Sequence, residues 1–424
     1  MEDGHQKATL PNGLRVLTAP MPSTHSVSLS IYVGAGSRYE TDAQAGLSHF
    51  VEHLCFKGTE RRPTPREVSE VIDSVGGIIN AATDRELTVY YCKVPRQHYE
   101  LALDVLTDLV RNPLFALDEM EKERQVILEE LAMIADSPPQ QVDVLLDETV
   151  WPDQPLGRDV AGSEASVRAL TREMAFDYLR QQYVPGNVVV SIAGAIGHGE
   201  AVESVDGVMG DWATGEPAPW FPALDGQVAP RVAVKYKATQ QAHMSLAVRG
   251  LPLQHPDRYA LNMLSAVLGE GMSSRLVQEL RERRSLCYDV HSYVSYFQDT
   301  GAFAVYTGVD PGRVDEALSA LLAELARVRD EGVTGDELSR ARELVKGRLL
   351  LRMEDSRAVS DWLGGQELLA GKVRTVEEVI AQIDAVSEDD VRRIGRRLLI
   401  TEQLNLAVVG PFRSERRFLS LLKF

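Results

Sequence analysis

The chain has 424 residues and a formal net charge of −17. A hydrophobic content of 44% and a charged content of 25% are typical of a globular protein, and the length suits two domains of about 200 residues. The negative balance argues against nucleic-acid binding, because no basic stripe is available to displace counterions from phosphates.

The N-terminal stretch and the cysteines set further bounds. The first ten residues lack the basic and apolar regions of a secretory signal, so a cytoplasmic location is the default expectation. No run approaches the roughly 18 apolar residues of a membrane span, and we therefore expect no membrane association. The three cysteines, Cys55, Cys92 and Cys287, are odd in number and widely spaced, which excludes a disulfide framework.

The first predicted strands are the alternating apolar runs 14–19 and 26–33. The helix that follows them carries the sequence His49-Phe50-Val51-Glu52-His53. Two histidines four residues apart lie on one face of a helix, so both imidazoles can bind one tetrahedral metal ion. Glu52 can point into the same site and accept a proton from water. The order H-x-x-E-H is that of the zinc peptidases called inverzincins, and the alternative is two surface histidines on an ordinary helix.

The next helix is predicted to begin at Thr64-Pro65-Arg66-Glu67, a capping box with proline at the first helical position. Its buried stripe consists of Val68, Val71, Ile72 and Val75, and Gly76-Gly77 ends it. Paired strands at 78–82 and 87–94 and helices at about 97–111 and 117–135 follow.

The same order of elements then repeats. Four prolines crowd the segment Gly215–Pro230, which is typical of a linker. After it we expect strands at 232–236 and 243–248, helices at 257–268 and 273–283, strands at 287–296 and 301–308, and helices at 311–330 and 334–353. The repeat indicates duplication of an α+β unit of about 200 residues.

The predicted fold class is therefore α+β, with two homologous lobes related by internal duplication. Each lobe should be an antiparallel-rich β-sheet covered by helices on one face. We expect an N-terminal metal-binding lobe over 1–215, a linker over 216–230 and a C-terminal lobe over 231–424. The helix at 257–268 has no His-x-x-Glu-His, and Arg348 stands where the first copy has Glu130, so only the first lobe should bind metal.

Catalytic zinc usually takes three protein ligands and leaves a fourth position open. The best source of the third ligand is the helix that contains Glu121, Glu123, Glu129 and Glu130. Here the chain resembles the pitrilysin/insulinase metallopeptidases, through His49–Thr59 and Glu123–Glu130, and most closely their short bacterial branch related to mitochondrial processing peptidase. The resemblance implies one Zn²⁺ per chain, bound by His49, His53 and Glu130.

Glu123 lies two turns before Glu130 and therefore on the same helix face. The resemblance implies a supporting carboxylate at this position, which suits a hydrogen-bond partner for a ligating histidine. The alternative for Glu123 and Glu129 is a solvated acidic helix face, and for Glu129 that interpretation is favoured.

The implied reaction is hydrolysis of a peptide bond, with Glu52 as the proton acceptor and donor. Arg281 and Tyr288 resemble the family's substrate-binding pair and would donate hydrogen bonds to carbonyl oxygens and to the oxyanion. The alternative is an ordinary basic helix end, since Arg281, Arg283 and Arg284 cluster.

The resemblance also implies a strand that pairs with the substrate. Gly77–Thr83 is that strand, with Gly77, Asn80 and Ala81 as contact positions, and backbone pairing would give broad specificity. Phe56 is a candidate for lining the pocket after the cut, and its alternative is a plain core residue.

By resemblance, two such chains form a homodimer around a chamber, in which Arg281 and Tyr288 of one subunit complete the zinc site of the other. The expected function is a zinc endopeptidase that cleaves unfolded peptides or oligopeptides. There are two alternatives: a non-catalytic structural or processing subunit, and one half of a heterodimer with another chain. The intact set of His49, Glu52, His53 and Glu130 argues against the first.

Overall fold

The computed structural model describes residues 4–424; Met1, Glu2 and Asp3, part of the N-terminal stretch considered above, lie outside the described residues. The chain forms two compact units built from interleaved segments. Unit 1 contains the chain up to Leu131, Asp159–Phe221 and Leu350–Thr375. Unit 2 contains Ala132–Arg158, Pro222–Leu349 and Val376–Phe424.

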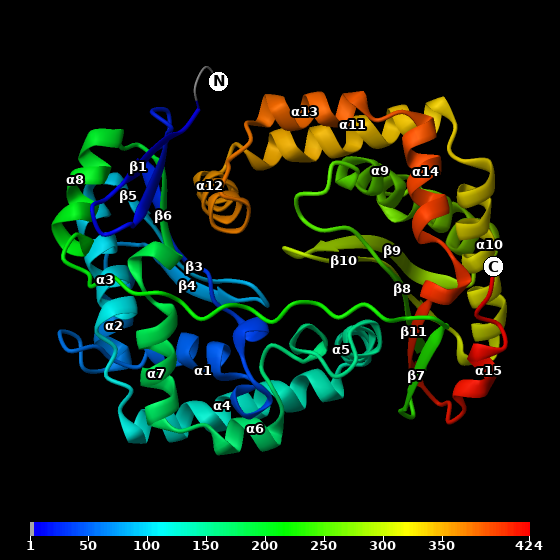
Figure 1. The fold of residues 1–424 in the computed structure, drawn as a ribbon, viewed down its shortest axis with the longest axis horizontal. Helices are drawn as coiled ribbons and strands as arrows, with labels where there is room; N and C mark the ends of the chain where they lie inside the picture. The colour runs from blue at the N-terminus through cyan, green and yellow to red at the C-terminus, as the bar shows by residue number, and fades with distance from the viewer. Residues whose placement is uncertain (1–3) are drawn as a thin grey trace. The chain divides into compact units, whose positions relative to one another are not determined.

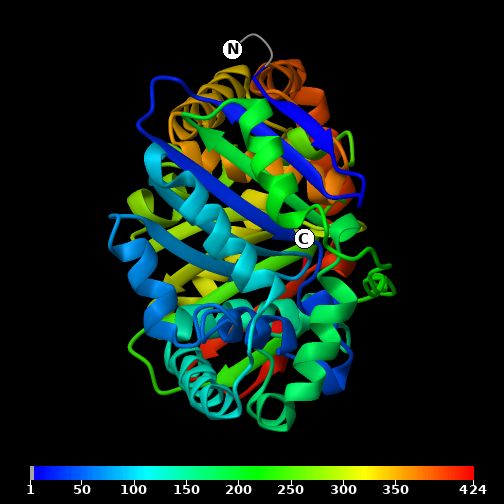
Figure 2. The ribbon, with the colours of Figure 1, turned by 90° about the vertical axis from the view of Figure 1, so that its left-hand side faces the viewer.

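Unit 1 holds a six-stranded sheet in the order β1-β2-β6-β3-β5-β4. Its strands are β1 (Gln6–Thr9), β2 (Arg15–Pro20), β3 (Ser26–Val33), β4 (Ile78–Thr83), β5 (Thr88–Pro95) and β6 (Val188–Gly194). Its helices are α1 (Leu47–Cys55), α2 (Pro65–Asp73), α3 (Tyr99–Arg111), most of α4 (Leu117–Asp136), α6 (Glu164–Ala169), α7 (Arg172–Gln182), α8 (His198–Met209) and α12 (Ser356–Ala370). Figure 2 looks onto the side of this unit that α3 and α8 cover.

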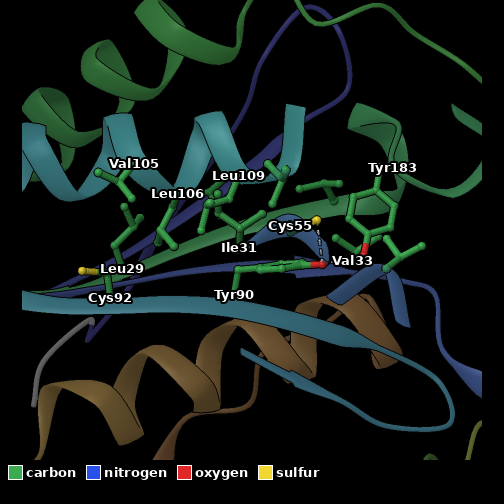
Figure 3. Packing of buried hydrophobic residues seen from close by; sticks show 14 of the residues in the cluster. Leu29, Ile31, Val33, Cys55, Tyr90, Cys92, Val105, Leu106, Leu109 and Tyr183 are labelled. Atoms are coloured by element: carbon green, nitrogen blue, oxygen red, sulfur yellow. Dashed lines mark hydrogen bonds between the residues drawn. The ribbon is translucent and has the colours of Figure 1, made fainter. Parts of the chain in front are cut away.

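Strand β3 shows why this sheet has helices on both faces. Successive side chains of a strand point to opposite faces. Leu29 and Ile31 belong to the main apolar core, beside α3 (Figure 3). Ser28 and Ser30 alternate with them and hydrogen-bond across the other face, to the hydroxyl groups of Ser356 and Ser360 in α12. The expected helical layer is therefore present on one face, and a single helix from the second half of the chain covers the opposite face.

Unit 2 holds a five-stranded sheet in the order β7-β11-β8-β10-β9. Its strands are β7 (Arg231–Tyr236), β8 (Ala242–Arg249), β9 (Cys287–Tyr296), β10 (Gly301–Val309) and β11 (Asn405–Gly410). Its helices are α5 (Pro138–Val150), α9 (Arg258–Gly269), a π-helix at Val277–Arg283, α10 (Val314–Glu331), most of α11 (Gly335–Arg352), α13 (Val376–Ala385), α14 (Glu388–Leu398) and α15 (Glu415–Leu419). The predicted helix at 273–283 is thus mostly one wide π-turn segment.

The two sheets have the same topology once β1 is set aside. In each, the first and last strands of the copy pair in parallel, β2 with β6 and β7 with β11, and the other neighbours pair antiparallel. The duplicated α+β fold with antiparallel-rich sheets is therefore confirmed. It also includes β6 and β11, central strands outside the predicted elements.

Each half of the chain gives one helix to the other half's sheet. Val142, Leu146 and Val150 of α5 pack against apolar residues of the unit 2 sheet, and α12 packs on the unit 1 sheet as described above (Figure 1). The predicted lobes 1–215 and 231–424 are contiguous stretches of chain, so they place α5 in the first lobe and α12 in the second, whereas α5 packs in unit 2 and α12 in unit 1. The reason is that a boundary predicted from composition divides the chain at one point, whereas the two cores are formed by contacts between distant segments.

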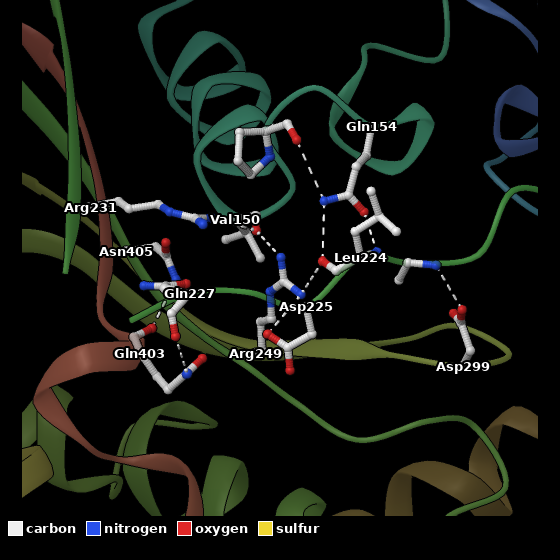
Figure 4. A network of polar contacts seen from close by, with 12 residues as sticks. Val150, Gln154, Leu224, Asp225, Gln227, Arg231, Arg249, Asp299, Gln403 and Asn405 are labelled. Carbon is white, nitrogen blue, oxygen red and sulfur yellow. Dashed lines mark hydrogen bonds and ion pairs between the residues drawn. The ribbon is translucent and has the colours of Figure 1, made fainter. Parts of the chain in front are cut away.

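The predicted linker 216–230 has no regular secondary structure, and its two parts are held to different units. In unit 1, Arg38 donates to the carbonyl oxygen of Phe221 and lies 4.2 Å from the Trp220 ring centroid. In unit 2, Arg249 donates to the carbonyl oxygens of Leu224 (2.6 Å) and Val150 (2.9 Å), as Figure 4 shows. The linker is therefore pinned along its length by buried arginines.

Two other expectations concern the whole chain. Cys55, Cys92 and Cys287 are all free thiols, and the first two are buried. Within residues 4–424, no helix has both the length and the apolar character needed to cross a membrane.

Candidate metal centre

Helix α1 is fixed at its N-terminus by a buried carboxylate. Glu40 accepts hydrogen bonds from the backbone N–H groups of Gly46 (2.8 Å) and Ser48 (2.6 Å) and from the Ser48 hydroxyl. An anion at this end satisfies otherwise unpaired helix N–H groups and interacts favourably with the helix dipole. Gly46 itself has φ +89°, and a Cβ atom there would lie 2.5 Å from the carbonyl oxygen of Ala161, so glycine is required.

The apolar face of α1 sets the direction of the histidines. Phe50, Val51 and Leu54 are fully buried in the unit 1 core. His49 and His53 lie on the other face, one turn apart, with ring centroids 4.5 Å apart. The amphipathic pattern of this short helix therefore turns both imidazoles away from the core and toward α4.

Glu130 on α4 meets both histidines. The Nε2 atoms of His49 and His53 each lie 3.8 Å from the Oε2 atom of Glu130, and the three candidate ligand atoms all lie within 4.8 Å of one another. Tetrahedral zinc with bonds of about 2.1 Å would separate its ligands by about 3.4 Å. The donor set therefore suits one zinc ion once the three side chains draw closer together, and no other such cluster occurs among residues 4–424.

Glu123 lies behind His53, on the same face of α4 as Glu130. Its Oε2 atom is 3.1 Å from Nδ1 of His53, and its Oε1 atom is 2.8 Å from Nζ of Lys57. Although burial would raise the pKa of Glu123, the hydrogen bonds from His53 and Lys57 hold that pKa below its usual value. A carboxylate on Nδ1 leaves Nε2 of His53 directed at the metal position.

Glu52 is 9% exposed and is held by the last residue of β4. The hydroxyl of Thr83 donates a 2.6 Å hydrogen bond to its Oε2 atom. Burial raises the pKa of Glu52, and the hydrogen bond from Thr83 and the nearby His53 offset part of that rise. A carboxylate with a raised pKa is suited to accept and return a proton near neutral pH.

The two histidines differ in their electrostatic surroundings. Burial, and then repulsion from His53, lower the pKa of His49 to about 4, so this imidazole is neutral and ready to bind a metal. For His53, burial acts to lower the pKa, but the hydrogen bond that its Nδ1–H donates to Glu123 and the charges of Glu130 and Glu52 raise that pKa above the usual value. A proton therefore competes with the metal chiefly at His53.

The other first-lobe candidates lie around the edge strand β4. A Cβ atom at Gly77 would lie 2.7 Å from Ile72 and 2.8 Å from Val94, so this close approach requires glycine. Asn80 is exposed, and its side-chain oxygen accepts the N–H of Ala81 at 2.8 Å. Phe56 is partly buried, packs against the unit 1 core and lies near Tyr90, with 6.2 Å between ring centroids. Its core interpretation therefore has direct support.

Arg281 and Tyr288 come together in unit 2. The Arg281 guanidinium lies 5.2 Å from the centroid of the Tyr288 ring, which is 78% exposed. Arg281 is part of the π-helix, a form frequently found at functional sites. Arg348, the counterpart of Glu130, forms an ion pair of 2.8 Å with Glu270. Unit 2 thus presents a guanidinium where unit 1 presents a candidate ligand carboxylate.

Three residues around the centre were not predicted from the sequence: Glu40, Lys57 and Thr83. Lys57 lies within His49–Thr59 and Thr83 within Gly77–Thr83, two segments that resemble the family, but the sequence does not show which side chains they contact. Glu40 precedes the motif by nine residues and contacts it only because the loop folds back.

Comparison with known proteins identifies the family of this chain. Residues 15–164 match the family model of insulinase, peptidase family M16, and residues 169–345 match that of the peptidase M16 inactive domain. A protein of Streptomyces coelicolor described as an uncharacterised zinc protease is 38% identical over 97% of this chain and 90% of its own length. YmxG of Bacillus subtilis, likewise described as an uncharacterised zinc protease, is 34% identical over 96% of this chain and 98% of its own length.

A solved structure with a similar fold is a protease from Helicobacter pylori, with a TM-score of 0.91 and 23% identity over 96% of this chain and 99% of that one. A structure described as the peptidase M16 inactive domain of Pseudomonas fluorescens gives a TM-score of 0.89 with 19% identity. Both lobes are matched by family models, and relatives described as zinc proteases match almost end to end. The chain therefore belongs to the insulinase family of zinc proteases, peptidase family M16.

Proposed function

We propose that this protein is a zinc-dependent endopeptidase of the H-x-x-E-H type that hydrolyses peptide bonds in unfolded peptides. The observation that carries the proposal is the convergence of His49, His53 and Glu130, with Glu52 beside them. The description of relatives as zinc proteases supports zinc as the metal.

In this proposal His49, His53 and Glu130 hold one zinc ion per chain, and Glu123 fixes the orientation of His53. Bound zinc would supply a Lewis acid that acidifies water and polarises the scissile carbonyl. Glu52 accepts the proton of the attacking water and delivers it to the departing amine. Its buried carboxylate suits both steps, because it is a better base than an exposed glutamate.

The peptide would bind by adding a strand to β4. This strand is the last in the sheet order, so one of its edges has no strand partner among the described residues of unit 1. Pairing along Gly77, Asn80 and Ala81 uses backbone groups and so tolerates many sequences. To bond there, the peptide must displace the Asn80 side chain from the Ala81 N–H or bond around it. Phe56 remains a candidate for contact with the side chain after the cut.

Arg281 and Tyr288 complete the proposed substrate contacts, supported by their mutual contact and by the exposure of the phenol. In a homodimer they would act on the zinc site of the other subunit, inside a chamber that excludes folded proteins by size. A mixture of Glu52→Gln and Arg281→Ala subunits tests this arrangement. Recovery of activity absent from each variant alone supports sharing of the site, and no recovery contradicts it.

The alternative of a non-catalytic subunit is not favoured by the match to an inactive domain, since that match covers 169–345 and leaves the residues of the metal centre outside it. The alternative of a heterodimer is decided by the native mass of the purified chain, which should be that of two copies.

The test of the function combines zinc content with cleavage of an unstructured fluorogenic peptide. Glu52→Gln should keep zinc and lose cleavage, and His49→Ala should lose both. Glu129→Gln is the matched control, because Glu129 is exposed and adjacent to Glu130 on the same helix. Cleavage by Glu52→Gln at the wild-type rate, or no zinc in the wild-type protein, would contradict the proposal.

A further inference from the structure

A threonine at the end of the edge strand touches the proposed general base. Thr83 is the last residue of β4, and its hydroxyl donates to the Oε2 atom of Glu52 at 2.6 Å. It is the one side-chain hydrogen bond to Glu52 found within the described part of the chain. The contact joins two elements, α1 and β4, between which α2 lies along the chain.

The direction of this hydrogen bond is fixed by its surroundings. An ionised carboxylate can only accept, so the single hydroxyl hydrogen of Thr83 points to Glu52. The oxygen of Thr83 in turn lies 3.4 Å from the hydroxyl of Thr88, a fully buried residue that also donates to the carbonyl oxygen of Ala35 at 2.9 Å. The hydroxyl of Thr83 therefore donates one hydrogen bond, and its acceptor is Glu52.

The backbone around Thr83 is held firmly. Thr83 pairs with Thr88 across the hairpin, and the N–H of Asp84 donates to the carbonyl oxygen of Leu87 at 2.8 Å. The carbonyl oxygen of Arg85 in the same turn accepts from the N–H of Arg38 at 2.9 Å. A hydroxyl on so fixed a frame restricts a glutamate side chain that otherwise rotates about three torsions.

We infer that Thr83 is a positioning residue: its hydroxyl holds one oxygen of Glu52 so that the other faces the attacking water, and it connects the base to the strand that takes the peptide. This inference rests on the proposed function. Because the peptide and Glu52 are then both held by the same strand, binding of the peptide along β4 places the scissile bond at a set distance from the Glu52 carboxylate. The hydroxyl should therefore affect the chemical step more than peptide binding.

The test uses the full-length zinc-loaded protein and two substitutions of Thr83. Thr83→Val keeps the shape and removes the donor, and it should lower kcat by about 10- to 100-fold, with KM changed by less than about threefold. Thr83→Ser keeps the donor and should restore kcat to within about threefold of wild type. Zinc per chain and the melting temperature should be unchanged in both variants.

A matched control is Thr18→Val. Thr18 is a buried threonine of β2 in the same sheet, and its hydroxyl also bonds one side chain, His198, at 2.8 Å. β2 is four places from β4 in the strand order, so this variant should leave kcat and KM unchanged.

The possible outcomes separate the inference from the function on which it rests. An active wild type with an equally active Thr83→Val variant would overturn the role of Thr83 and leave the endopeptidase intact. Equal losses in Thr83→Val and Thr83→Ser, or loss of zinc from Thr83→Val, would also overturn it, since the donor would not be what matters. An inactive, zinc-free wild type would overturn the proposed function itself, and the inference with it.

Discussion

The exchanged helix α12 makes a sharp prediction about stability. Gly364 lies on its buried face, and a Cβ atom there would lie 2.4 Å from two ring carbons of Tyr32 and 3.1 Å from Cβ of Ser191. The Tyr32 ring cannot move aside freely, because it is nearly buried and its hydroxyl donates to Asp361 of the same helix. Gly364→Ala must therefore lift α12 from the sheet.

Comparison with the neighbouring Gly365 gives the expected size of the destabilisation. Gly365 has no atom within 4 Å of the Cβ position, so Gly365→Ala gains only the helix propensity of alanine, up to about 1 kcal/mol. Gly364→Ala gains the same propensity but adds overpacking of about 1–3 kcal/mol. The two variants should therefore differ by about 1–3 kcal/mol in the free energy of unfolding.

Thermal unfolding followed by circular dichroism measures this difference. We expect Gly364→Ala to melt about 2–10 °C below Gly365→Ala, given the size of unit 1. Equal melting temperatures for the two variants would refute the close packing of α12 on the unit 1 sheet.

Three further predictions concern charge and metal. The hydrogen bonds from Arg275 lower the pKa of Glu337 to about 2, so its contribution to stability is present above the unfolded pKa near 4.5 and is lost as pH falls toward 2. Glu337→Gln should therefore lower the free energy of unfolding, measured by urea titration, by about 1 kcal/mol at pH 7, after allowance for solvent screening. Near pH 2 the variant and the wild type should be equally stable. The same loss of stability at both pH values would contradict this prediction. Lys57→Met should weaken zinc binding about tenfold in a chelator competition assay, because Lys57 forms an ion pair with Glu123. The control Lys122→Met, on an exposed part of α4, should leave zinc affinity unchanged. Equal zinc affinities of the two variants would argue against the role of Lys57. A chelator should lower the melting temperature of wild type but not of His49→Ala, because only bound metal stabilises the folded state; equal shifts would indicate a metal effect elsewhere.

The sequence predicted the elements whose signals are local. The capping box at Thr64 is present, with Glu67 accepting from the Thr64 N–H at 3.0 Å. Helix α2 ends at Asp73, three residues before Gly76, so Val75 of the predicted stripe lies beyond it. The grouping of His49, His53 and Glu130 also follows from local spacing on two helices together with a family resemblance.

What could not be predicted depends on long-range packing. The sheet on which α5 or α12 packs cannot be read along the chain, because it depends on contacts with distant residues, such as those of Ser356 and Ser360 with Ser28 and Ser30. Thr83 and Glu52 are 31 positions apart, and their contact depends on how α1 lies against β4. Side-chain partners of this kind require the tertiary structure, even where both residues fall inside recognised motifs.

The coordination of zinc is the most direct test of the account. X-ray absorption at the zinc edge should show two imidazole nitrogens and a carboxylate oxygen at about 2.0–2.2 Å in the wild-type protein and in Glu129→Gln. Glu130→Gln should lose the carboxylate contribution and most of the bound zinc. A spectrum and zinc content unchanged by Glu130→Gln would contradict a metal centre built from His49, His53 and Glu130.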